Sequence, residues 1–178
     1  MNWLLGLLRR PARLDGKVTA ELAAYRSRAH PDPGAALAMQ RAIVVDVEAS
    51  GLDPFRDRLI SIGAIAVQGG LARLDDSFDT VLRQETASDD RNILVHGIGG
   101  SAQLLGRDPA SGLIDFLGFS GKASLIAFHA DFDRILIERT AAATLRMKPD
   151  NAWLDLALLA PALFPDHERA ARALDDWL

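Results

Sequence analysis

Asp46 and Glu48 are the first residues whose type and spacing could do chemistry. They stand two apart in residues 42–48 (AIVVDVE), which otherwise hold Ala, Ile and Val. Side chains alternate along a strand, so both carboxylates lie on one face, about 7 Å apart. Two anions on a covered strand need a positive charge, and a hard cation bound through oxygen is the candidate. The alternative is a strand with one wet face, where both simply point to water.

A second acidic point lies in residues 128–133 (FHADFD), at the expected junction of a short strand and a helix. Asp131 has the position of an ordinary helix-start residue, which accepts hydrogen bonds from free N–H groups and favours the helix dipole. Asp133 follows an apolar Phe132, and we expect it to point back across the sheet toward the first strand.

The elements that would position these carboxylates follow from hydrophobic periodicity and turn residues. Gly and Pro separate three strand-like runs that predict an antiparallel meander, and alternating helix and strand patterns follow. The strands are expected at 42–48, 59–67, 71–82 and 124–128, and the helices at 101–117, from 131, 153–163 and 167–178, with a loop around 96–100. This order predicts an α/β fold with a mixed sheet.

Residues 1–40 are expected to form an N-terminal helical appendage and a linker, with a helix over 18–28 and the linker at 30–34. Trp3, Leu4, Leu7 and Leu8 fall on one helical face ahead of two arginines. We expect this leader to cover apolar surface of the domain; a short amphipathic membrane anchor is the alternative. An apolar start followed by arginines is the reverse of a signal peptide, so we expect a cytoplasmic protein.

Composition excludes several classes of site. The chain of 178 residues has no cysteine, which excludes disulfides, thiolate metal sites and cysteine nucleophiles. Its net charge of −4 lacks the basic field of a protein that holds duplex DNA through phosphates alone. No phosphate loop, dinucleotide fingerprint or serine nucleophile elbow is present. Any metal must therefore bind to oxygen or imidazole.

The two acidic stretches together resemble a known family. Residues 46–52 (DVEASGL) look like the first motif of the DEDD (DnaQ-like) 3′–5′ exonucleases, and residues 128–133 look like the second. The resemblance, closest to proofreading enzymes such as the epsilon subunit of DNA polymerase III, runs over 41–178 and includes 57–63 and the 96–98 loop. It implies a ribonuclease-H-like mixed sheet, three antiparallel strands followed by parallel strands, with helices on both faces.

The resemblance also implies roles for individual residues. Asp46, Glu48 and Asp133 would be the catalytic metal ligands, holding Mg²⁺ or Mn²⁺, two ions in the intact family site. The substrate, a single-stranded or frayed nucleic-acid 3′ end, would contact Ser50, Gly51, Leu52, His96, His129 and Phe132. Ala49 and Ser50 stand where the family usually has threonines, and His129 where it usually has Asn. The expected partner is a polymerase or another replication protein. No binding to a membrane is expected.

The third family motif, a His followed five residues later by an Asp, is not found, because Arg172 stands five residues after His167. We therefore expect the domain over 41–178 to be truncated before its last helix, without the general base and the fourth carboxylate. Exonuclease activity should be impaired. The alternatives are a non-catalytic domain that binds nucleic acid or protein, or a remnant with no site. Apolar surface left uncovered predicts self-association, with the leader contributing to a homodimer interface.

Overall fold

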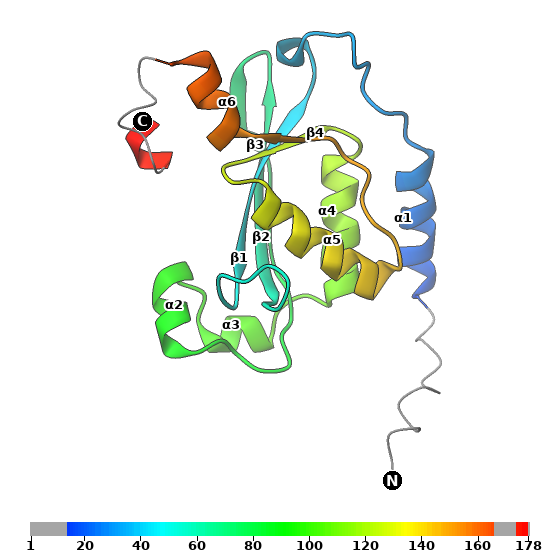
Figure 1. The fold of residues 1–178 in the computed structure, drawn as a ribbon. Coiled ribbons are helices and arrows are strands. Elements are labelled where there is room, and N and C mark those ends of the chain that lie inside the picture. Colours follow the sequence, from blue (N-terminus) through cyan, green and yellow to red (C-terminus); the bar gives the residue numbers. More distant parts are fainter. Residues whose placement is uncertain (1–13, 166–173, 178) are drawn as a thin grey trace.

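A five-stranded mixed sheet forms the centre of the molecule (Figure 1). The structure is a computed structural model, and it describes residues 14–165 and 174–177. In the order β3-β2-β1-β4-β5, β1 and β2 pair antiparallel, as do β2 and β3, whereas β1–β4 and β4–β5 are parallel. The strands are β1 (Ala42–Ala49), β2 (Leu59–Gln68), β3 (Leu71–Val81), β4 (Ser124–Ala127) and β5 (Trp153–Asp155). The predicted mixed sheet is confirmed.

The helices depart from the predicted boundaries at three places. They are α1 (Gly16–Ser27), α2 (Asp90–His96), α3 (Gly100–Leu104), α4 (Pro109–Ser120), α5 (Asp131–Leu145) and α6 (Leu156–Leu163), with short 3₁₀ segments η2 (Leu37–Met39) and η3 (Leu174–Trp177). The helix expected at 101–117 is divided, because Asp108 caps a new helix with Pro109 in its first turn. The expected 96–100 loop begins with the end of a helix, α2, and the expected 153–163 helix is preceded by β5.

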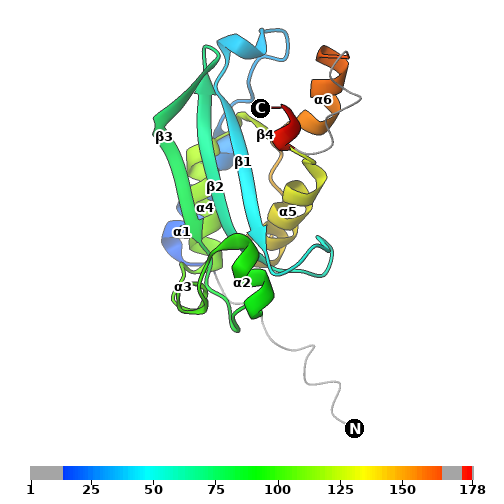
Figure 2. The same ribbon diagram turned by 90° about the vertical axis from the view of Figure 1, so that its left-hand side faces the viewer.

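Alternation along β1 separates the core from the acidic face. Ile43, Val45 and Val47 are buried against α4 and α5, so Asp46 and Glu48 point to the opposite side of the sheet. Helices α1, α4 and α5 cover the core side (Figure 2). The acidic side has α2 near one end of β1 and α6 near the other (Figures 1 and 2). The sheet therefore keeps one covered face and one more open face.

Helix α1 packs into the same core as the sheet. Its Val18, Leu22 and Tyr25 are buried with the residues of α4. The Tyr25 hydroxyl donates to Asp150 at 2.9 Å, and the Lys122 ammonium lies 3.8 Å from the centre of the Tyr25 ring. The segment expected as an appendage thus contributes to the folded unit from residue 14 onward. The expected leader helix at residues 3–8 and most of the expected 167–178 helix lie outside the described residues.

Within residues 14–165 and 174–177, none of the helices combines the length and apolar character needed to cross a membrane.

Candidate active site

Asp46 and Glu48 stand on the open face of β1, opposite small residues of β2. In the antiparallel register Asp46 lies across from Gly63, and Glu48 across from Ser61. Cross-strand partners point to the same side of a sheet, so no bulky neighbour on β2 covers the two carboxylates. Asp46 is exposed and Glu48 is half-buried. The strand therefore presents both acids on one accessible patch.

Asp133 comes from the first turn of α5 and reaches the free edge of β1. The two strands β1 and β4 pair only from Ala42 to Val44, so the later half of β1 has no strand on that side. The Val47 N–H there donates to Oδ1 of Asp133 at 3.1 Å. The Asp133 side chain is buried, and the residue is only 4% exposed. Asp133 thus accepts the hydrogen bond that a neighbouring strand would otherwise accept from Val47, the residue between Asp46 and Glu48.

The three carboxylates influence one another electrostatically. The pKa of Asp133 is raised to about 7, mainly by burial; the charges of Asp46 and Asp155 contribute to the rise, and the hydrogen bond from Val47 opposes it. Partial removal of the carboxylate from water also raises the pKa of Asp46, although the residue stays exposed on the surface. For Glu48, burial and the Asp46 charge raise the pKa, while nearby His96 lowers it. Because the charge of Asp46 raises the pKa of Asp133, the two carboxylates lie in the same part of the site.

A divalent cation fits the chemistry of these donors. All three acids offer hard oxygen ligands, and none forms an ion pair with Lys or Arg among the described residues. In the same part of the chain, no three acids or imidazoles are close enough together to hold one ion. Ligation by all three groups would therefore require them to draw together around the cation.

The loop after β1 has a defined conformation. The Ser50 hydroxyl accepts a hydrogen bond from the Arg58 N–H at 2.9 Å and donates to Asp57 at 3.0 Å. A Cβ on Gly51 would fall 2.5 Å from the Asp57 carboxylate, which would have to move away from the Ser50 hydroxyl to make room. Leu52 is 92% exposed. In this loop Ser50 and Gly51 are half-buried, whereas Leu52 is exposed to solvent beside the acidic strand.

The other three expected substrate residues have different surroundings. The His96 ring is held on both nitrogens, since Nδ1 accepts from the Ile98 N–H at 3.0 Å and Nε2 lies 3.1 Å from the Ser88 hydroxyl. His129 is exposed and has a left-handed backbone, with φ of 59°. Phe132 is half-buried and packs against the core. Of the three, His129 is the most accessible to a ligand.

Sequence reasoning missed Asp155, at the end of β5. Its charge contributes to the raised pKa of Asp133, and its Oδ1 accepts a hydrogen bond from the His129 N–H at 3.0 Å. An Asp directly before the apolar run 156–163 (LALLAPAL) is a helix N-cap signal, which could have identified the capping role. The contact with His129 joins residues 26 apart and has no such local signal.

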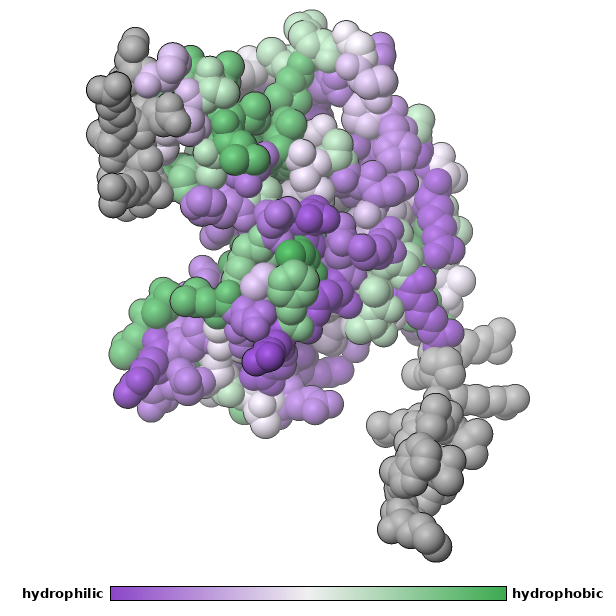
Figure 3. Space-filling model, viewed as in Figure 1, coloured by the Kyte–Doolittle hydropathy of each residue, from purple (hydrophilic) through white to green (hydrophobic). Residues whose placement is uncertain are grey.

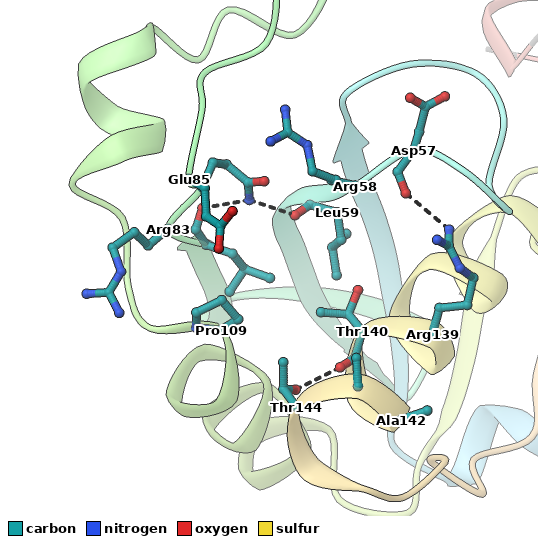
Figure 4. Close-up of a pocket in the computed structure, with 13 residues that line it drawn as sticks. Asp57, Arg58, Leu59, Arg83, Glu85, Pro109, Arg139, Thr140, Ala142 and Thr144 are labelled. Atoms are coloured by element: carbon teal, nitrogen blue, oxygen red, sulfur yellow. Dashed lines mark hydrogen bonds between the residues drawn. The ribbon is translucent and has the colours of Figure 1, made fainter. Parts of the chain in front are cut away.

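The surface is hollowed on the acidic side, between the α2–α3 region and α6 (Figure 3). Leu94 and Val95 of α2, 85% and 82% exposed, lie on that side. A separate cavity of about 770 Å³ lies between α5, the start of α4 and the chain following β3 (Figure 4). It is lined by Leu59, Leu82, Pro109, Arg139 and neighbours, and by none of the expected site residues. The hollow on the acidic side is therefore the surface that a ligand of Asp46 and Glu48 would use.

Comparisons with known proteins agree with the geometry. A family model described as "Exonuclease" matches residues 43–178. The PolC-type DNA polymerase III of Thermotoga maritima is 27% identical over 121 residues, covering 68% of this chain and 9% of that protein, and the Thermotoga petrophila protein matches equally. This chain thus spans a small part of those relatives.

Solved structures of exonuclease I share the fold. The apo form superposes with a TM-score of 0.56 at 15% identity, over 71% of this chain and 31% of that one. E. coli exonuclease I in complex with a dT13 oligonucleotide gives a TM-score of 0.59 at 16% identity, over 77% and 33%. A zinc-bound complex of the E. coli enzyme with single-stranded DNA gives 0.57 at 16% identity, over 71% and 30%. The ribonuclease-H-like fold class expected from the sequence is confirmed.

Proposed function

Because the chain belongs to the exonuclease family, we propose that it is a metal-dependent 3′–5′ exonuclease that releases nucleotides from nucleic-acid 3′ ends. The observation that carries this proposal is the placement of Asp133 against β1, beside Asp46 and Glu48, within the matched range. Unpaired acids at one locality are what a site for hard cations needs. A structural role alone would not explain three acids that have raised pKa values and no Lys or Arg partner within residues 14–165 and 174–177.

In this proposal Asp46, Glu48 and Asp133 hold Mg²⁺ or Mn²⁺, two ions in the complete site. When bound, the ions would make water a nucleophile and stabilise charge on the phosphate and leaving oxygens. The carboxylates contribute by giving up any bound proton and turning their oxygens toward the ions. Asp133 must lose the proton favoured by its burial, so ion binding and ionisation of Asp133 are coupled.

The substrate in this proposal is a single-stranded or frayed 3′ end that enters the hollow on the acidic side. Exposed Leu52 would contact a base, and exposed His129 could donate a hydrogen bond near the reacting phosphate. Ser50, Gly51, His96 and Phe132 would act by shaping the walls around it. Support comes from the fold shared with exonuclease I, one structure of which holds a dT13 oligonucleotide. The match to PolC-type relatives supports a polymerase as partner.

We further propose that catalysis by this chain is weak, since no His stands five residues before an Asp at its end. Ala171 precedes Asp176 at that spacing. The sequence therefore offers neither the general base nor the fourth carboxylate at the expected spacing. The second candidate function, non-catalytic binding of nucleic acid or a protein, is favoured by the same missing His. We also propose self-association through exposed apolar surface, which is compatible with either function.

The test uses the full chain, Mn²⁺ and single-stranded DNA labelled at the 5′ or the 3′ end. We expect slow, metal-dependent release of mononucleotides from the 3′ end, lost in Asp46→Asn and retained in Asp75→Asn. Asp75 is a suitable control because it pairs with Arg73 on the β3 edge. DNA retention without cleavage would support the binding function. If the chain neither cleaves nor retains the DNA, both the exonuclease function and the binding function are refuted.

A further inference from the structure

The turn between β4 and α5 holds a backbone conformation that its sequence does not favour. His129 has φ of 59°, in the left-handed region where a residue with a Cβ is strained. Its side chain is exposed and makes one ring contact, with Phe128 at 4.7 Å between centroids. Since no buried contact of its own side chain requires this conformation, the surrounding backbone must impose it.

The first turn of helix α5 lacks a side-chain cap from the helix's own N-cap residue. Its N-cap residue, Ala130, provides no side-chain hydrogen bond. Within the turn, the His129 carbonyl accepts from the Phe132 N–H at 3.1 Å. The His129 N–H is satisfied from outside the turn, by Oδ1 of Asp155 at 3.0 Å. The only side chain among the described residues that bonds to this strained backbone therefore comes from the end of β5.

Asp155 serves two elements with one oxygen. The same Oδ1 accepts from the Ala157 N–H at 2.9 Å and caps α6. A cap needs only that second bond, so the bond to His129 is additional to capping. Because Asp155 also pairs in register with Ala127 at the end of β4, its position relative to the turn is fixed by the sheet.

We propose that Asp155 is a positioning residue: by holding the His129 N–H, it fixes the start of α5 and thereby the position of the Asp133 carboxylate at the edge of β1. Asp133 lies four residues after His129, in the first turn of that helix. A change in the turn therefore moves Asp133 relative to Val47 and Asp46. The effect on catalysis rests on the proposed function, whereas the coupling between Asp155 and His129 does not.

A double-mutant cycle tests the proposal with Asp155→Ala, His129→Gly and the double variant. Glycine adopts a positive φ without strain, so it removes the need for the restraint. Asp155→Asn keeps an acceptor oxygen and is the conservative variant. Asp108→Ala is the matched control, because Asp108 caps α4 in the same way, far from the acidic strand. The readouts are the melting temperature, the gain in melting temperature with Mn²⁺, and kcat and KM on single-stranded DNA.

We expect Asp155→Ala to lower kcat and Mn²⁺ affinity about 10–100-fold, as is usual for residues that orient a ligand, with little change in KM. His129→Gly in that background should restore most of the loss in melting temperature and Mn²⁺ affinity, which are the readouts of the cycle, and Asp155→Asn should stay near wild type in all of them. Asp108→Ala should lower the melting temperature without changing kcat. Additive effects of the two changes on melting temperature and Mn²⁺ affinity, or no rescue by glycine, would overturn the proposal.

The readouts separate this proposal from the proposed function. If wild type cleaves DNA and Asp155→Ala has unchanged kcat and Mn²⁺ affinity, the positioning role is refuted while the exonuclease function stands. If no variant cleaves DNA but the cycle shows coupling in melting temperature and Mn²⁺ affinity, the positioning role is supported and the exonuclease function fails.

Discussion

Replacing Asp133 by Asn should stabilise the metal-free protein at pH 8. The carboxylate is buried, its pKa is raised from 3.8 to about 7 by burial and then by Asp46, and no Lys or Arg among the described residues pairs with it. At pH 8 the folded protein therefore carries an unfavourable buried charge. Asn removes the charge and keeps an oxygen that can accept from the Val47 N–H.

The size of the effect follows from the two pKa values. A rise from 3.8 to about 7 corresponds to about 4 kcal/mol at most, because 1 pH unit is worth about 1.4 kcal/mol. Relaxation and repacking reduce this, so we expect about 2–4 kcal/mol, or roughly 5–15 °C in melting temperature for a chain of this length.

The sign of the pH dependence is fixed by the direction of the pKa change. Between pH 4 and 7 the folded Asp133 holds a proton that the unfolded chain has lost, so the free energy of unfolding falls as pH rises through this window. Below pH 4 both states are protonated and the advantage of Asn disappears. Thermal unfolding in EDTA at pH 4, 6 and 8 measures this.

The matched control is Asp131→Asn on the same helix turn. Asp131 is 81% exposed and pairs with Arg134, so its loss should change stability by less than about 0.5 kcal/mol at any of these pH values. Mn²⁺ should stabilise wild type and Asp131→Asn but not Asp133→Asn. A lower melting temperature for Asp133→Asn at pH 8, or an equal gain at pH 4 and pH 8, would refute the reasoning.

Three further outcomes are expected. Asp46→Asn should lower the pKa of Asp133, because it removes a repelling charge; an unchanged titration midpoint in NMR would contradict this. Gly51→Ala should cost about 1–3 kcal/mol, since its Cβ would overlap a carboxylate oxygen, whereas Gly118→Ala meets open space; equal urea midpoints would contradict the close approach. Tyr25→Phe should cost about 1–3 kcal/mol by removing the donor to the buried Asn151 Oδ1, and an unchanged melting temperature would show that this oxygen finds another donor.

Local periodicity was sufficient for the first four strands and for the first half of the site. Alternation alone placed Asp46 and Glu48 on one face of β1, and the meander followed from Gly and Pro. Strand β5 was missed because three residues before an apolar helix carry no period of their own. Helix α2 was missed because Gly97, Gly99 and Gly100 suggested a loop.

The second half of the site depends on contacts between distant parts of the chain. Asp133 was expected to point toward the first strand, but its bond to the Val47 N–H exists only because β4 stops pairing with β1 after Val44. The raised pKa values of the three acids result mainly from burial, and burial cannot be deduced from the sequence alone. The hydrogen bond between the His129 N–H and Asp155 likewise requires the parallel register of β4 and β5.

The region shared with relatives and the region that folds together do not start at the same residue. The family match begins at residue 43, yet Tyr25 covers the ammonium of Lys122, whose side chain is only 4% exposed. In a chimera that joins residues 43–178 to a foreign N-terminal segment, the buried ammonium of Lys122 would lose its aromatic cover, and the core beneath α1 would be exposed. Helix α1 and Lys122 therefore belong to one packing unit, and a transplanted domain should begin at residue 14 or before rather than at the start of the family match.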